Sequence, residues 1–165
     1  MTERGANKTA DAIIISQSPD VCDTPRGSKI VAVPYPIYAK FDSAQDTSIN
    51  VNFQGNAAFN FASYLPKVTG NEAGVKGGVM SGVNKGIVNP SAKSSSVRIN
   101  GEWAIRNAHQ MEMNCSAPKT KGNTTGKVTY LHIEELARVN EETREIQEPL
   151  KEEYQQGAEG IYYMD

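Results

Sequence analysis

The sequence is poor in the residue types on which many enzyme active sites and metal centres depend. It contains only two cysteines, Cys22 and Cys115, and two histidines, His109 and His132. Neither cysteine belongs to a C-x-x-C pair, which excludes a zinc ribbon and a thioredoxin motif. No G-x-S-x-G sequence is present, and the acidic residues of the body suggest no acid–base couple. We therefore expect a protein that is not an enzyme.

Aromatic residues and long apolar runs are also scarce. Aromatic side chains make up 7% of the 165 residues, and the apolar runs are short, so a large layered α/β core is not expected. No run approaches the roughly 20 apolar residues of a membrane-spanning helix. Residues 1–12 are polar and lack the apolar segment of a signal peptide. We expect cytoplasmic synthesis, followed by secretion or injection without a signal peptide.

Charge is distributed unevenly along the chain. Residues 133–165 hold ten acidic and three basic residues, a net charge of −7. Residues 1–132 hold nine acidic and fourteen basic residues, a net charge of +5. The overall charge of −2 thus hides a mildly basic body and an acidic C-terminal part. The basic residues form no stripe and do not alternate with aromatic ones, so nucleic-acid binding is not indicated.

Residues 12–127 are typical of a body of short β-strands, and residues 1–11 of a flexible arm. The pair Asn100-Gly101 lies between two alternating runs and predicts a tight hairpin, because both residues tolerate a positive φ. The sequence around Gly55 repeats this pattern more weakly. The expected fold class is mainly β. Short apolar or alternating runs predict strands at Ala12–Ser16, Lys29–Val33, Ser48–Phe53, Val97–Asn100 and Glu102–Arg106.

Six glycines fall between Gly70 and Gly86. Their spacing matches neither G-x-G-x-x-G nor G-x-x-x-x-G-K-[ST], the sequences of two phosphate-binding loops. We favour a structural interpretation, in which glycine permits close approach of chain segments and left-handed backbone torsions.

Residues 128–165 predict an acidic helical extension. Apolar residues recur at spacings of three and four from about Tyr130 to Glu148, which indicates an amphipathic helix with a narrow apolar stripe. Pro149 is expected to end or kink this helix. The stripe consists of Leu136, Val139, Thr143, Ile146 and Leu150.

The two cysteines allow three interpretations. They are either buried small hydrophobic residues, or a disulfide, against which a cytoplasmic origin argues, or metal ligands. In the third case Cys22, His109 and Cys115 supply soft or borderline ligands suited to tetrahedral zinc. The residues alone leave these interpretations open.

Several segments together resemble one family. They are S-P-D-V-C-D-T-P at 18–25, V-P-Y-P-I at 33–37, the glycine block at 70–82, S-V-R-I-N-G at 96–101, and R-N-A-H-Q-M at 106–111 with Asn114. Over about residues 12–126 the chain is similar to the PAAR-like proteins that cap the spike of type VI secretion systems and related contractile injection machines. The resemblance implies a small cone of short strands, with its base on a trimeric VgrG-type spike and one tip per trimer.

The resemblance also implies roles for individual residues. The apex of such cones often holds a structural zinc ion, for which Cys22 and His109 are the expected ligands and Cys115 the next candidate. The implied function is a non-enzymatic tip that sharpens the spike for membrane puncture and carries effectors, without stable membrane insertion. The 39 residues after Gly126 are too few for a fused toxin with its own core.

Two alternatives remain at this point. The first is an adaptor that loads an effector through the C-terminal helix. The second is a small metal-dependent hydrolase or toxin, which would use the site of Cys22 and His109 and would need Glu112 as its general base.

Overall fold

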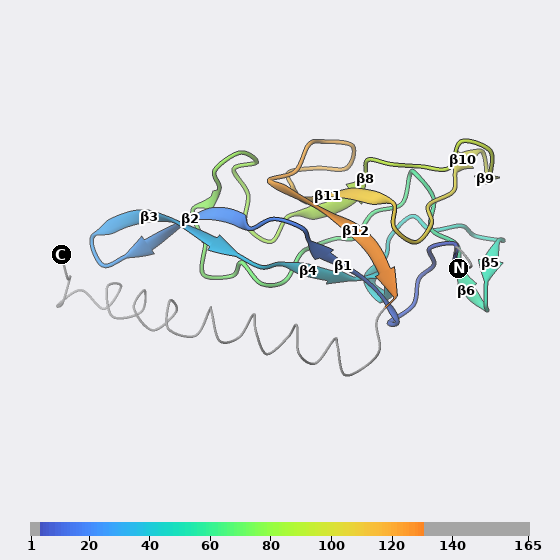
Figure 1. Cartoon of the computed structure of the whole chain (residues 1–165), viewed down its shortest axis with the longest axis horizontal. Coiled ribbons are helices and arrows are strands. Elements are labelled where there is room, and N and C mark those ends of the chain that lie inside the picture. The colour runs from blue at the N-terminus through green and yellow to red at the C-terminus, as the bar shows by residue number, and fades with distance from the viewer. Residues whose placement is uncertain (1–3, 131–165) are drawn as a thin grey trace.

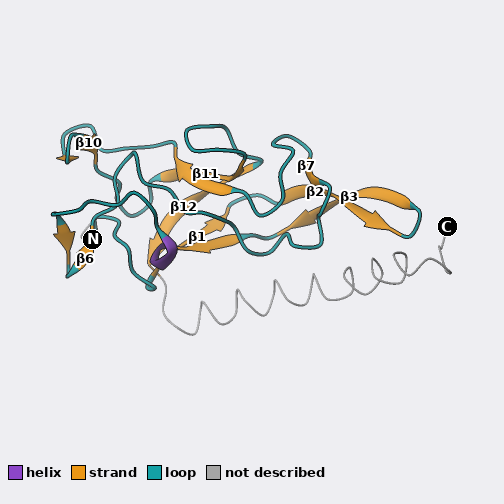
Figure 2. Cartoon of the chain, turned by 180° about the vertical axis from the view of Figure 1, so that it is seen from behind, coloured by secondary structure: helices purple, strands orange, loops and turns teal. Residues whose placement is uncertain are grey.

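The computed structural model describes residues 4–130. Its only helix in this range is a short 3-10 turn, Phe41–Ser43, so the fold is mainly β as predicted (Figure 2). No helix in this range is long and apolar enough to cross a membrane. The strands are β1 (Ala12–Ser16), β2 (Asp20–Arg26), β3 (Lys29–Tyr35), β4 (Tyr38–Lys40), β5 (Asn52–Phe53), β6 (Asn56–Ala57), β7 (Gly77–Gly78), β8 (Ile87–Pro90), β9 (Arg98–Ile99), β10 (Glu102–Trp103), β11 (Gln110–Cys115) and β12 (Thr124–Tyr130).

The largest sheet brings together the first and last strands. Its order is β4-β1-β12-β11-β8, and neighbouring strands are antiparallel. β1 pairs with β12 along its whole length, from Ala12 opposite Tyr130 to Ser16 opposite Gly126. The successive residues Ile13 and Ile14 point to opposite faces of the sheet and are both buried, so β1 is covered on both faces.

Smaller β-structures extend from this sheet in two directions (Figure 1). On one side, β3, β2 and β7 form a three-stranded antiparallel sheet, from which the β2–β3 hairpin projects. On the other side lie the hairpins β5–β6 and β9–β10. We call these two regions the hairpin end and the opposite end.

Both tight hairpins form where the sequence predicts them. Asn100 and Gly101 connect β9 to β10 with φ angles of 52° and 85°. Gln54 and Gly55 connect β5 to β6 with φ angles of 52° and 82°. Two successive positive φ angles match the right-handed twist of the flanking strands, which is why these sequences favour hairpins.

Other strand bounds differ from the prediction. Only the last two residues of the run Ser48–Phe53 are in a strand, because the Ser48 hydroxyl accepts a hydrogen bond from the Val51 N–H (2.9 Å) and the chain curls before β5. β12 continues to Tyr130, three residues past the expected end of the body, and pairs there with β1. The rest of the predicted helical extension, residues 131–165, lies outside the described residues.

The residues before β1, for which a flexible arm is predicted, pack against the body over residues 4–11. Ala6 and Asn7 are buried. The Ala6 N–H donates to the Ile105 carbonyl (2.8 Å), and Asn7 forms a β-bridge with Ala58. Backbone groups left unpaired by the body at the opposite end are thus satisfied by this segment.

One large apolar cluster forms the core of the described chain. It includes Phe41 and Phe59, whose ring centroids are 5.0 Å apart and whose ring planes are tilted by 60°. The same cluster includes Cys22 and Tyr35, so it continues into the sheet at the hairpin end.

Candidate functional site

A buried carboxylate lies where the hairpin end joins the large sheet. Asp20, the first residue of β2, is fully buried. Its oxygens accept hydrogen bonds from the side-chain amides of Asn71 (2.7 Å), Asn114 (3.2 and 3.3 Å) and Asn123 (2.6 Å), and from the Cys22 thiol (3.2 Å). Hydrogen bonds to an ionised acceptor are stronger than neutral ones, and they offset the cost of removing the charge from water. We call these five residues the Asp20 cluster.

Each asparagine of the Asp20 cluster also holds a backbone segment. The carbonyl oxygen of the Asn114 side chain accepts a hydrogen bond from the Gly86 N–H (2.8 Å). The side-chain oxygen of Asn123 accepts a hydrogen bond from the Met80 N–H (2.8 Å). The side-chain oxygen of Asn71 accepts a hydrogen bond from the Lys85 N–H, just before Gly86 (3.3 Å). The cluster therefore fastens β2, the glycine block, β11 and the loop before β12 to one another.

The glycine block approaches the Asp20 cluster more closely than a side chain would permit. A Cβ atom added at Gly74 would lie 2.5 Å from Cβ of Cys22, and one added at Gly78 would lie 2.5 Å from Cγ of Asn123. Gly77 adopts a φ of 95°, and a Cβ atom there would lie 2.6 Å from a backbone oxygen. These contacts confirm the interpretation of a tightly turning backbone that needs glycine for close approach.

The Cys22 thiol acts as a hydrogen-bond donor in this arrangement. Burial raises its pKa above the ordinary value of 9.0, and the adjacent Asp20 carboxylate raises it further. The thiol is therefore protonated at neutral pH, whereas the thiolate is the form that binds metals and attacks electrophiles.

The other two predicted zinc ligands have hydrogen-bond partners outside the Asp20 cluster. His109 precedes β11, and its Nδ1 atom accepts a hydrogen bond from the Arg106 N–H (3.0 Å). Cys115 ends β11, accepts a hydrogen bond from the Asn89 amide (3.1 Å), and has a pKa raised to about 12, chiefly by burial. At about 3.3 Å per residue, the strand between His109 and Cys115 allows a separation of up to roughly 20 Å, which the irregularity between Glu112 and Cys115 shortens.

As they lie here, Cys22, His109 and Cys115 do not fit one shared zinc ion, whose ligands lie within about 2.3 Å of the metal. No group of three or more His, Cys, Asp or Glu side chains within residues 4–130 is placed to hold a metal ion. Glu112, the base required by the hydrolase alternative, accepts a hydrogen bond from the Gly122 N–H (2.9 Å). His132 lies outside the described residues.

Comparison with known protein families gives a match between residues 13–126 and the family described as "Toxin PAAR-like domain". The chain belongs to this family. The matched range begins in β1, ends in β12 and includes every residue of the Asp20 cluster. The resemblance inferred from the sequence motifs is thereby confirmed, and it makes this a PAAR-like protein associated with type VI secretion spikes or their toxins. Comparisons with curated proteins and with solved structures each found no match.

The Asp20 cluster of this PAAR-like domain was missed by reasoning from the sequence. Asp20, Asn71 and Asn114 all lie in or beside the segments that carry the resemblance, but their meeting depends on chain pairings over 51 and 94 residues. Asn123 lies in none of these segments. The signal available was the spacing of Asp20 and Cys22, which places both on the same face of a strand.

Proposed function

We propose that this PAAR-like protein is a structural spike tip. It caps the blunt end of a trimeric VgrG-type spike, with one copy per trimer, and is carried with the spike and its effectors into a target cell. Family membership supports this proposal. The observation that carries it is an exposed apolar surface at the hairpin end. This group of residues, which we call the apolar end, consists of Ile30, Val31, Val75, Val79 and Met80, which are 37% to 69% exposed. Ile30 and Val31 are consecutive in β3, so the group includes both faces of the hairpin.

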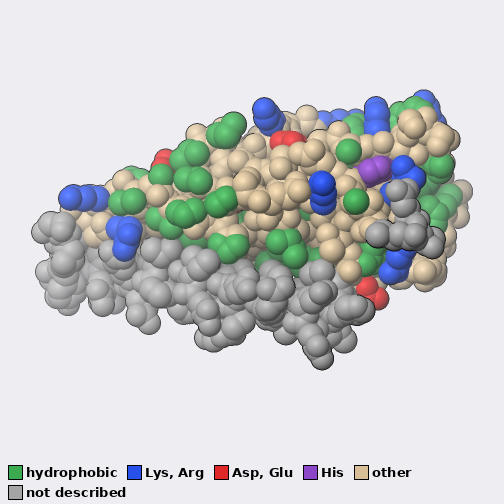
Figure 3. Space-filling model, in the orientation of Figure 1, with side chains coloured by type: hydrophobic (Ala, Val, Ile, Leu, Met, Phe, Trp, Pro, Cys, Tyr) green, Lys and Arg blue, Asp and Glu red, His purple; other side chains and the backbone are tan. Residues whose placement is uncertain are grey.

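The exposed apolar side chains are concentrated at one end of the molecule. Figure 3 shows hydrophobic side chains over the β2–β3 hairpin and the neighbouring glycine block. Of the seven exposed large hydrophobic residues within residues 4–130, only Ile49 and Val97 lie outside the apolar end. Soluble monomers rarely expose apolar side chains in contiguous patches, and such patches commonly mark contacts with a partner protein.

The Asp20 cluster contacts the backbone of the glycine block, which carries part of the apolar end. Asn123 accepts hydrogen bonds from the backbone of Met80 and Ser81, and β7, which precedes Val79, pairs with Cys22 of β2. These contacts fix the backbone that presents Val79 and Met80. A surface that is already ordered loses less conformational entropy when it binds, which favours docking on a rigid spike.

The proposal is tested by measuring association with the cognate spike trimer. Met80→Glu places a charge in the apolar end, and we expect it to weaken binding about tenfold or more. Ile49→Glu is the matched control, because Ile49 is 95% exposed but lies at the opposite end, and it should bind as the wild type does. Loss of binding in Ile49→Glu but not in Met80→Glu would reverse the assignment of the docking end.

A further inference from the structure

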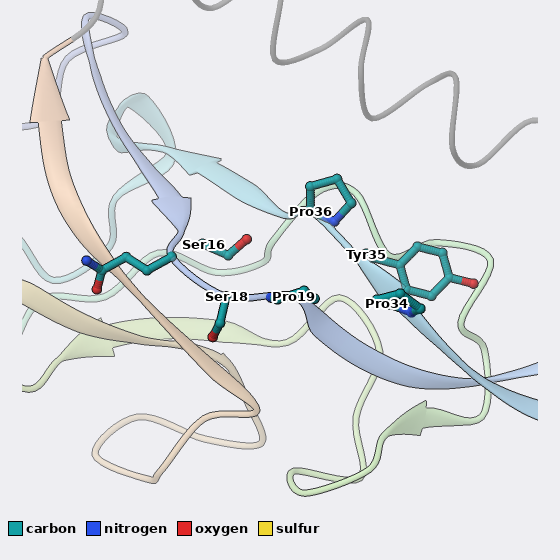
Figure 4. Close-up of a pocket in the computed structure, with 7 residues that line it drawn as sticks. Ser16, Ser18, Pro19, Pro34, Tyr35 and Pro36 are labelled. Atoms are coloured by element: carbon teal, nitrogen blue, oxygen red, sulfur yellow. The ribbon is translucent and has the colours of Figure 1, made fainter.

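A groove with a volume of about 350 Å³ opens where β1 ends and the chain enters β2. Figure 4 shows Pro19, Pro34 and Pro36 around Tyr35, with Ser16 at the rim. Pro19 and Pro34 are exposed, so this apolar surface is uncovered by the body itself. The groove lies at the base of the hairpin end, apart from the five residues of the apolar end.

The last described residue, Tyr130, lies at the other end of β1 from this groove. Tyr130 lies opposite Ala12, at the start of β1, whereas the groove lies beyond Ser16, at its end. Four strand intervals separate these points by about 14 Å. The 35 residues that follow Tyr130 include the amphipathic pattern of residues 130–148. At about 1.5 Å per residue, a helix of that length reaches past the groove if the chain reverses after β12.

The charges of the two parts of the chain also favour contact between the C-terminal part and the body near β1. The acidic C-terminal part carries a net charge of −7 and the rest of the chain +5. Lys40 of β4 lies opposite Ile13, and Lys127 of β12 lies opposite Ile15, so basic residues flank β1 on both neighbouring strands. A helix with an acidic outer face and an apolar inner stripe complements a basic strand border beside an apolar groove.

We propose that the groove is the docking site of this chain's own C-terminal helix, with the apolar stripe on Pro19, Pro34 and Pro36. At about 1.5 Å per residue, Val139 lies about 14 Å along the helix from Tyr130, so it is the stripe residue nearest the groove. The docked segment covers the groove within one molecule and leaves the apolar end free for a partner, so this proposal does not depend on the spike-tip function.

Disulfide trapping in the full chain tests this arrangement. We expect Pro36→Cys combined with Val139→Cys to form an intramolecular disulfide under mild oxidation, because Pro36 lines the groove beside the end of β1. Ile49→Cys combined with Val139→Cys is the matched control and should not link, since Ile49 lies at the opposite end. The native Cys22 and Cys115 are buried and protonated, so neither competes. Links that form only between two copies, or equally in both pairs, would overturn the proposal.

Hydrogen exchange supplies a second test that needs no cysteine. Val139→Asp should displace the stripe and raise the exchange rates of amides in residues 15–18 severalfold, while Glu145→Gln, on the polar face, should leave them unchanged. Equal exchange in the wild type and in Val139→Asp would show that the segment does not cover the groove. Protection that appears only after the spike trimer is added would assign the groove to that partner instead.

Discussion

Asp20 is a charged side chain with no access to solvent, and four donors surround it. Three of these donors are asparagine amides and one is a thiol. Each donor would be left without its acceptor if the carboxylate were removed. Unpaired buried polar groups cost free energy, so the stability of the surrounding loops depends on this one residue.

We expect Asp20→Asn to lower the free energy of unfolding by about 3 kcal/mol or more. The substitution keeps the volume but places an amide donor against amide donors, and each unsatisfied buried group costs about 1 to 3 kcal/mol. Urea denaturation followed by circular dichroism measures the change. Asp42→Asn is the control, because Asp42 is exposed. A change in Asp20→Asn within about 0.5 kcal/mol of this surface control would contradict the role of the cluster.

The raised pKa of Cys115 predicts a loss of stability at high pH. The folded state keeps the thiol proton up to a pKa of about 12, whereas the unfolded chain releases it near 9.0. Stability is therefore lost as pH rises above 9. Between pH 8 and 10 the wild type should lose about 1.4 kcal/mol more than Cys115→Ala. Unfolding curves at the two pH values measure this difference, and equal losses in both proteins would exclude a buried, protonated thiol.

Glycine is needed for different reasons in different secondary-structure elements. In the β9–β10 hairpin, Gly101 has a φ of 85° and no atom within 4 Å of an added Cβ, so its role is conformational. In β7, Gly78 lies against the Asn123 side chain, so its role is to leave room for the Asp20 cluster. The same residue type thus serves a local and a long-range purpose.

We therefore expect Gly78→Ala to destabilise the protein more than Gly101→Ala. The second substitution imposes only backbone strain, of about 1 kcal/mol. The first displaces Asn123 and disturbs its hydrogen bonds to Asp20 and Met80, and should cost at least twice as much. Thermal or urea unfolding of the two variants measures the order. A larger loss in Gly101→Ala would contradict the close-packing account.

The elements fixed by local sequence were predictable, and those fixed by distant pairing were not. Asn100-Gly101 encodes its own turn, and β1 was predicted with its observed bounds. β2 was missed because its inward residues include Asp20 and Thr24, so burial does not follow hydrophobicity. Because the burial of β2 does not follow hydrophobicity, the sequence could not reveal that Cys22 contacts the amides of Asn71 and Asn114 rather than His109.

At the scale of the whole molecule, the buried Asp20 cluster and the exposed apolar end lie close together. The Asp20 cluster joins the hairpin end to the large sheet, and the exposed apolar side chains lie over the segments that it fastens. The opposite end is closed by short hairpins and by residues 4–11. The apolar end is the surface that we propose to contact the spike.

The stoichiometry of the complex with the cognate VgrG-type trimer tests this account most directly. Native mass spectrometry of the two purified, folded proteins should show one copy of this chain on three spike chains, because one tip covers the threefold axis. Met80→Glu should reduce this species, and Ile49→Glu should not. Separate masses for the tip and the trimer under all conditions, or three copies per trimer, would contradict the proposal that the chain caps the spike.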